Sequence, residues 1–275
     1  MARLRVSAIS FLNTAPLMWD FDHGKLRQKY QVDYTLPSAC AELLRQGMAD
    51  IGIIPAAAYA SIPGLVVIPD ITIAAKGPVK SILLISKVPV EKIRTVAADT
   101  SSRSSVALLQ VLFAKFYRVQ PTFVPMAPKL KLMLKACDAA LVIGDPALLA
   151  NTSLDNKTGD NKTSYEVRDL AAEWQRLTGK AFVFAFWAVR KEAATVELVR
   201  DFQQSRDHGL VPENLAKTAR EWAVRLGLPE AEIVSYLRNN IFYYLDAECL
   251  AGLKLFYEYA AEVGALERAP RVEFI

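Results

Sequence analysis

The sequence has few of the residue types that bind metal ions or form disulfides. Among its 275 residues are only two histidines, and its three cysteines, Cys40, Cys137 and Cys249, are far apart and form no C-x-x-C pair. Neither His23 nor His208 has a partner at the spacing of zinc ligands. We therefore expect no metal site. The odd, scattered set of cysteines predicts reduced thiols in a cytoplasmic protein.

Several motifs and segments of other protein classes are also missing. The sequence contains no glycine-rich phosphate loop of standard spacing and no G-x-S-x-G elbow, which argues against nucleotide use and against a serine hydrolase. It shows no signal-peptide pattern and no apolar run of about 18 residues. No basic run reaches five residues, although 33 basic residues outnumber 29 acidic ones. We expect neither a nucleic-acid nor a membrane partner.

What the sequence does contain is the pattern of an α/β protein. Hydrophobic residues make up 52% of the chain, enough for a large core. Short apolar strands at Leu4–Ile9, Val32–Leu36 and Asp50–Ile54 alternate with helical segments, as in a parallel α/β sheet. A second set of such elements follows, and then come helices near the C-terminus. We predict two lobes with a cleft between them, one formed by residues 1–86 plus 183–275 and the other by residues 87–182.

A hydroxyl-rich turn between a predicted strand and a predicted helix is the strongest candidate for ligand binding. In residues 100–105, five of six side chains carry a hydroxyl, and the sixth is Arg103. The start of a helix offers unpaired N–H groups and a partial positive charge, and arginine matches a carboxylate or phosphate. Ordinary helix capping would need only one hydroxyl. The turn therefore predicts an anion site at Ser102, Arg103, Ser104 and Ser105, with simple capping as the alternative.

Other candidate residues follow predicted strands or begin a helix: Ser10 and Asn13, Ser38, Gly77 and Ser81, and Gly144 and Asp145. Asp145 is the strongest acid–base candidate because it follows an apolar strand, where burial would raise its pKa; the alternative is that it caps the next turn. Asn13 is either a ligand contact or a structural turn residue. Ser81 is either a ligand contact or an ordinary serine at the edge of a strand.

These motifs, taken together and in order, resemble a known family. The chain is similar to the menaquinone-biosynthesis family, which has a two-lobed type-2 periplasmic-binding-protein-like fold. Phe11 and the pair Lys180–Ala181 depart from the usual family residues. The segments that carry the resemblance are Ser10–Leu17, Pro37–Ser38, Gly77–Ser81, Asp99–Val106, Ile143–Asp145 and Thr178–Trp187.

The resemblance implies a carbon–oxygen lyase of the futalosine route. Such an enzyme removes water from chorismate to give 3-[(1-carboxyvinyl)oxy]benzoate, without a cofactor. It implies that Asn13, Ser81 and Asp145 surround the reacting ring and that the serine-rich turn binds a carboxylate. Either a protein side chain or the enolpyruvyl carboxylate of the substrate itself takes the ring proton. The alternative is a cytoplasmic binding protein for small carboxylates that performs no catalysis. The sequence leaves the oligomeric state open.

Overall fold

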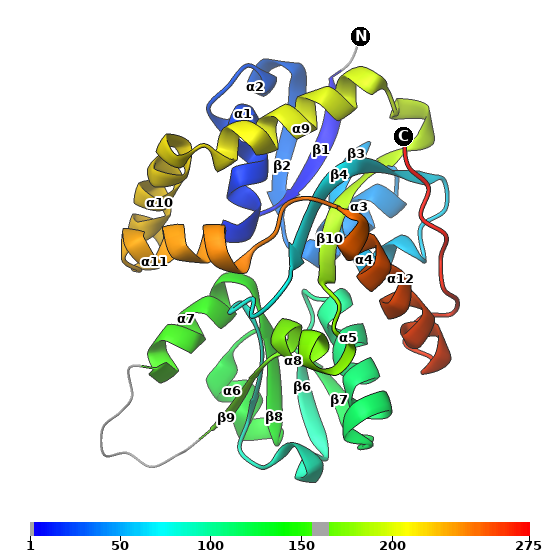
Figure 1. The fold of residues 1–275 in the computed structure, drawn as a ribbon, viewed down its shortest axis with the longest axis vertical. Coiled ribbons are helices and arrows are strands. Elements are labelled where there is room, and N and C mark those ends of the chain that lie inside the picture. Colours follow the sequence, from blue (N-terminus) through cyan, green and yellow to red (C-terminus); the bar gives the residue numbers. More distant parts are fainter. Residues whose placement is uncertain (1–2, 156–164) are drawn as a thin grey trace.

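Two five-stranded sheets, one in each lobe, organise the chain (Figure 1). The computed structural model describes residues 3–155 and 165–275. The first sheet has the order β2-β1-β3-β10-β4 and comprises β1 (Leu4–Ile9), β2 (Tyr30–Thr35), β3 (Ile51–Pro55), β4 (Leu65–Ala75) and β10 (Phe182–Arg190). The second has the order β7-β6-β8-β5-β9 and comprises β5 (Ile82–Ser86), β6 (Thr95–Asp99), β7 (Thr122–Met126), β8 (Ala139–Ile143) and β9 (Glu166–Asp169).

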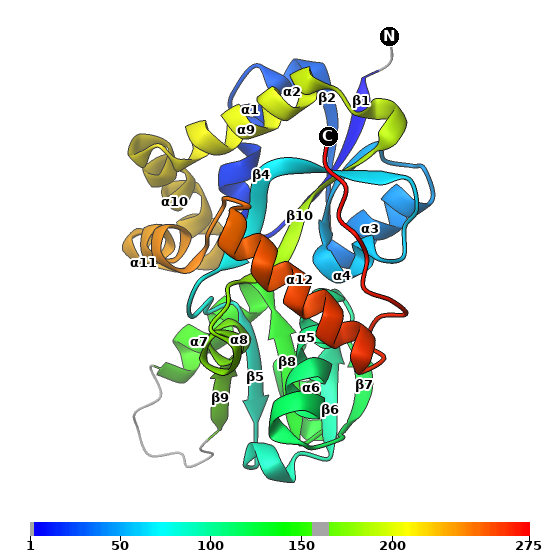
Figure 2. The same cartoon turned by 45° about the vertical axis from the view of Figure 1, so that its right-hand side comes forward.

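Helices cover both sheets. In the first lobe they are η1 (Leu12–Met18), α1 (Trp19–Asp22), α2 (Leu26–Lys29), α3 (Pro37–Arg45), α4 (Ala56–Tyr59), η4 (Lys191–Ala193), α9 (Val196–Leu210), α10 (Pro212–Leu226), α11 (Glu230–Ser235) and η5 (Tyr236–Asn240). In the second they are η2 (Val90–Lys92), α5 (Ser104–Leu112), η3 (Phe113–Tyr117), α6 (Leu130–Ala136), α7 (Gly144–Asp155) and α8 (Leu170–Thr178). The last helix, α12 (Ala247–Glu262), packs against both β10 and α5 and so spans the two lobes (Figure 2).

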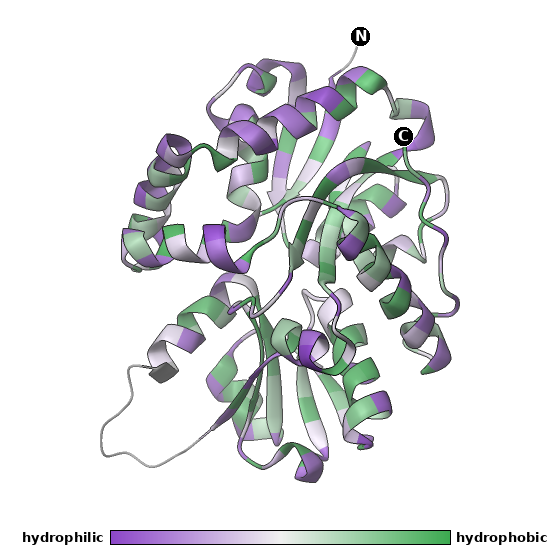
Figure 3. Cartoon of the chain, in the orientation of Figure 1, coloured by the Kyte–Doolittle hydropathy of each residue, from purple (hydrophilic) through white to green (hydrophobic). Residues whose placement is uncertain are grey.

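The inner strands of the two sheets are buried because their sequences are apolar on both faces, whereas the edge strands β2, β7 and β9 are partly exposed. Every residue of β3, β5 and β8 is buried, as expected for strands covered by helices on each side. Figure 3 shows the apolar residues gathered on the strands and the polar ones on the outer faces of the helices. Within the described residues, no helix has the length and apolar character needed to span a membrane.

Three features of the fold differ from what the sequence indicates. β4 is one continuous strand where the sequence indicates two apolar runs, because Asp70 adopts a left-handed conformation that lets the strand bend without ending. β5 pairs with β8 and β9 of the second sheet, although the expected boundary at residue 86 places it in the first lobe. The polar composition of residues 151–164 indicates a surface loop or a mobile hairpin, but α7 continues to Asp155, and residues 156–164 lie outside the described part.

The chain passes between the two sheets twice. The first crossing is the segment 76–81 between β4 and β5, and the second is the segment 179–181 between α8 and β10. We therefore propose that the first lobe boundary lies within 76–81 rather than at residue 86. Both crossings lie beside the contact between the lobes, so a side chain on a crossing segment is well placed to act on a ligand held between them.

Candidate functional site

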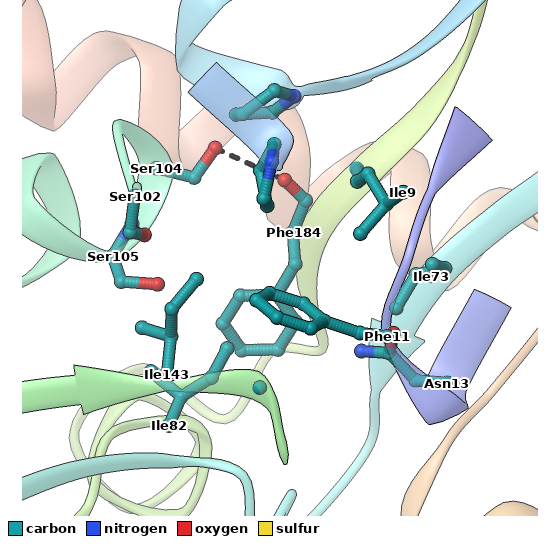
Figure 4. A pocket seen from close by; sticks show the side chains of 14 residues that line it. Ile9, Phe11, Asn13, Ile73, Ile82, Ser102, Ser104, Ser105, Ile143 and Phe184 are labelled. Carbon is teal, nitrogen blue, oxygen red and sulfur yellow. Dashed lines mark hydrogen bonds between the residues drawn. The ribbon is translucent and has the colours of Figure 1, made fainter. Parts of the chain in front are cut away.

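A small cavity of about 50 Å³ lies between the two lobes. Both lobes contribute to its walls, as Figure 4 shows. Known pockets for drug-sized ligands measure about 300–1,000 Å³, so a ring-shaped ligand enters only if a wall moves. The cavity is lined by Ile9, Phe11, Asn13, Pro37, Pro55, Ile73, Ile82, Ser102, Ser104, Ser105, Ile143, Gly144, Phe184 and Ala185.

The ring of Phe11 forms one wall of the cavity and takes up most of the space there. It follows β1 and lies across the middle of the cavity (Figure 4). On its other side is Gly144, where an added Cβ would lie only 2.5 Å from the Phe11 ring. Gly144 has a φ of 63°, which favours glycine. Glycine is therefore needed at position 144 both for the backbone and for the ring that packs on it.

Three serines of the predicted anion site reach the cavity, and each has a different local role. Ser102 Oγ accepts a hydrogen bond from Ser105 N at 3.2 Å and so caps helix α5. Ser104 Oγ accepts from Ala57 N at 3.1 Å and donates to Phe184 O at 3.0 Å, which joins the second lobe to the first. Ser105 Oγ has no hydrogen-bond partner among the described residues and points into the cavity (Figure 4).

On the opposite side, Asn13 lines the cavity and Ser81 lies behind it. Ser81 is fully buried, and its Oγ accepts a 2.8 Å hydrogen bond from Tyr236 Oη of the helix η5. The Asn13 side chain lies close enough to Tyr236 to offset part of the rise that burial causes in the pKa of the phenol. Tyr236 therefore lies near two predicted catalytic residues: it is hydrogen-bonded to Ser81, which is buried behind the cavity, and it is close to Asn13, which lines the cavity.

Asp145 lies next to the cavity without lining it. Its Oδ1 accepts a hydrogen bond of 2.9 Å from Leu12 N, the first residue of η1 in the other lobe. Burial raises the pKa of Asp145 to about 6, and the bond from Leu12 opposes that shift. The carboxyl group therefore connects the two lobes at the edge of the cavity. This position favours a bridging role over direct proton abstraction from a ligand.

The remaining predicted residues do not line this cavity. Arg103 is exposed and lines a separate groove of about 540 Å³ on the other side of the α5 N-terminus. Ser38 N donates to Ser101 O at 3.1 Å, another bond between the lobes. Ser10 N donates to Thr35 O and so extends the pairing of β1 with β2. Gly77 lies in the first crossing segment, beside Gln175 of α8. Within the described ranges, no group of three or more histidine, cysteine or acidic side chains could hold a metal ion.

Comparison with known proteins identifies the family. The family model described as menaquinone biosynthesis matches residues 4–262. The chain belongs to the menaquinone biosynthesis family. One curated relative of this member is chorismate dehydratase of Thermus thermophilus, which is 31% identical over 258 residues, or 90% of this chain and 92% of that protein.

Solved structures confirm the fold of this member of the menaquinone biosynthesis family. Protein AF1704 of Archaeoglobus fulgidus has a TM-score of 0.70 at 16% identity and covers 96% of this chain and 98% of its own. The alkanesulfonate-binding protein SsuA of Xanthomonas axonopodis pv. citri, bound to MOPS, has a TM-score of 0.68 at 17% identity and covers 98% and 95%. The predicted two-lobed, periplasmic-binding-protein-like fold is confirmed.

No pattern in the sequence identifies Tyr236 as a residue near the site. Tyr236 is separated from Ser81 by 155 positions and lies in a helical segment that reads as ordinary core. The helix α11 changes at Tyr236 into the π-helix η5. Such a change often marks a functional site, but it is not visible in sequence periodicity.

Proposed function

We propose that this chain is a chorismate dehydratase, an enzyme that removes water from chorismate to give 3-[(1-carboxyvinyl)oxy]benzoate on the futalosine route to menaquinone. The similarity to the Thermus thermophilus chorismate dehydratase along nine-tenths of the chain supports the activity. The geometric observation that carries the proposal is the cavity itself. It has apolar walls suited to a ring and polar groups on two opposite sides, at Ser105 and at Asn13.

The reaction requires selective elimination more than a strong base. Loss of the C4 hydroxyl and of the C3 proton makes the ring aromatic, which supplies the driving force. The site must favour loss of water over loss of the enolpyruvyl group, and this is a matter of position and of donors placed at the leaving oxygen. Asn13 provides such a donor on one side, and Ser81, which is buried behind it, becomes a second donor once the wall moves to admit the ligand. The free hydroxyl of Ser105 and the N-terminus of α5 provide a carboxylate site on the other.

We assign the C3 proton to the enolpyruvyl carboxylate of the substrate. Asp145 is the only acidic side chain proposed for the reaction, and its Oδ1 is already bonded to Leu12 N. Its position beside the cavity suits it to hold η1 against the second lobe while the substrate is enclosed. On this assignment the protein aligns the substrate and stabilises the leaving hydroxyl, and the substrate carries the base.

The test is to incubate the purified protein with chorismate and follow the products by liquid chromatography and mass spectrometry. We expect chorismate to be replaced by the enolpyruvyl benzoate, one water lighter, with no added metal or cofactor. A matched sample without protein controls for spontaneous decay of chorismate. Chorismate that binds but is recovered unchanged would instead support the binding protein for small carboxylates. Chorismate that neither binds nor reacts would contradict both functions.

A further inference from the structure

The ring of Phe11 occupies the place where a ligand ring would have to lie. It lies across the cavity, whose walls include Ser105 of the second lobe and Asn13 of the first (Figure 4). The space left beside the ring measures about 50 Å³, whereas a cavity that binds benzene measures about 150 Å³. A six-membered ring therefore cannot enter while the Phe11 ring stays where it is.

Hydrogen bonds fix the backbone around Phe11 but do not hold its ring. On one side, Ser10 N donates to Thr35 O at 2.9 Å, and on the other side Leu12 N donates to Asp145 Oδ1 at 2.9 Å. The ring is apolar, so packing against its neighbours is what keeps it in place. It can turn about its side-chain bonds without breaking either of these hydrogen bonds.

Separation of the two lobes is a larger change than rotation of this ring. Several of the hydrogen bonds described above join the lobes beside the cavity and would have to break. The helix α12 adds a further connection: Tyr257 Oη donates to Ala56 O of the first lobe at 2.8 Å, and Glu262 forms an ion pair with Lys115 of the second lobe. Movement of the Phe11 side chain is therefore the change that admits a ligand with the fewest broken contacts.

We propose that Phe11 is a plug: its ring fills the ring site of the free protein and turns away when a six-membered ring with a carboxylate enters. The Phe11 ring is itself a flat six-membered carbon ring, and the apolar walls around it include Ile9, Ile73 and Ile143. The space that it vacates therefore suits a ligand ring of the same size. The free hydroxyl of Ser105, at the same cavity, suits the carboxylate. This inference rests on the proposed function only in taking the cavity as the ligand site.

A plug makes every ring-shaped ligand compete with a side chain of the protein. The apparent affinity equals the intrinsic affinity multiplied by the fraction of molecules in which the Phe11 ring has turned away. This factor is the same for each ligand that needs the ring site, whether or not the ligand reacts. Removal of the plug should therefore strengthen the binding of all such ligands by one common factor, and it should leave unchanged the binding of a carboxylate that has no ring.

The test is calorimetric titration of the Phe11→Ala variant with benzoate, an unreactive ring with a carboxylate. We expect the dissociation constant for benzoate to fall at least about 10-fold relative to the unsubstituted protein. Cyclohexanecarboxylate, a second six-membered ring, should gain by the same factor to within about 3-fold. Acetate has the carboxylate without the ring and can bind beside the plug, so its dissociation constant should change less than about 2-fold.

Phe123→Ala is the matched control variant. Phe123 is half-buried and lines the groove beside Arg103 instead of the cavity. Loss of its ring should leave the dissociation constant for benzoate within about 2-fold of that of the unsubstituted protein. Ser105→Ala in the Phe11→Ala background locates the ligand, because it should reverse most of the gain in affinity.

Phe11→Leu is measured alongside, because it keeps an apolar side chain and should show a smaller gain in the same direction. No gain for benzoate in either Phe11 variant, an equal gain in Phe123→Ala, or a gain that acetate shares would each overturn the inference. So would failure of both Phe11 variants to fold, because the ring would then support the core. An unsubstituted protein that binds chorismate and leaves it unchanged would contradict the proposed function alone, since benzoate binding does not depend on the reaction.

Discussion

The two polar sides of the cavity are built in different ways. One side is the serine-rich turn described above, called the serine turn from here on, and its side chains bond to backbone groups. Ser104 Oγ accepts from Ala57 N and donates to Phe184 O, and Ser102 Oγ caps α5. On the opposite side, Asn13 lines the cavity, and behind it Tyr236 Oη donates to Ser81 Oγ, so the contacts there are between side chains. The first side is anchored to the main chain, while the second depends on the orientation of hydroxyl and amide groups.

This difference predicts a division of labour. Backbone-anchored groups change little when one side chain is removed, so the serine turn is suited to hold a carboxylate in a fixed place. A network of side chains transmits the loss of one member to the next, so the opposite side is suited to direct donors at the atom where charge develops. We expect substitutions in the serine turn to change KM and substitutions on the opposite side to change kcat.

The largest effect should come from Ser81→Ala. Removing the donor to the leaving hydroxyl should lower kcat about 100- to 1,000-fold, with the dissociation constant for chorismate changed less than about 3-fold. Steady-state kinetics and calorimetric titration measure the two quantities separately. A loss of affinity as large as the loss of rate would show that both sides simply bind the substrate, and the division would not hold.

Next in size is Gly144→Ala, which disturbs the point where Phe11 packs between the two sides. The left-handed backbone costs alanine about 1–2 kcal/mol, and the added Cβ would collide with the Phe11 ring at 2.5 Å, for about 1–3 kcal/mol more. Gly179→Ala is the matched control, with a φ of 68° and no atom within 4 Å of the added Cβ. Denaturant unfolding should show a larger loss in the free energy of unfolding for Gly144→Ala than for Gly179→Ala. Equal losses would mean that the Phe11 ring moves aside at no cost.

A smaller effect is expected in the serine turn from Ser105→Ala. Loss of a hydroxyl that binds a carboxylate should raise KM about 10-fold and leave kcat within about 3-fold. Ser104→Ala provides the contrast, because it leaves the buried Ala57 N without a partner. It should lower the free energy of unfolding by about 1–3 kcal/mol. If Ser105→Ala instead lowers kcat at unchanged KM, the serine turn belongs to the chemistry.

The smallest effect concerns pH and Asp145. Its pKa is about 6 in the folded protein and about 4 in an unfolded chain, so the folded state binds more protons between these values. The titration of the Asp145 carboxyl therefore lowers the free energy of unfolding as pH rises from about 4 to 6. Asp145→Asn keeps an acceptor for Leu12 N and should remove about 1 kcal/mol of this decrease in the free energy of unfolding. The expected change is this small because the carboxyl group is partly exposed. Unfolding curves at pH 4, 5 and 6 measure it, and an unchanged slope would contradict the assignment.

Local sequence patterns predict much of this architecture. Apolar runs bounded by turn residues place β1, β2 and β3 within two positions of their observed ends. The segments that follow predicted strands contain Asn13, Gly144 and Ser105, and the structure gathers them at one cavity. These predictions succeed because they use a general property of α/β folds, in which the carboxyl ends of strands meet at one edge.

Features set by distant contacts are not predictable in this way. The pairing of β5 with β8 and β9 depends on residues far along the chain, so an apolar run at 82–86 does not reveal its sheet. Arg103 shares the serine turn, but it is exposed at the N-cap of α5 and lines a different groove. Tyr236 reaches Ser81 only through the tertiary packing of η5. Sequence identifies the polar residues near a site, whereas packing decides which of them face the ligand.

The measurement that tests the central claim most directly is a crystal structure of the Ser81→Ala variant soaked with chorismate. The account predicts chorismate in the cavity between the lobes, with the Phe11 ring displaced, a carboxylate at Ser105 and the C4 hydroxyl toward Asn13. Chorismate bound instead in the groove beside Arg103, with Phe11 still against Gly144, would contradict it.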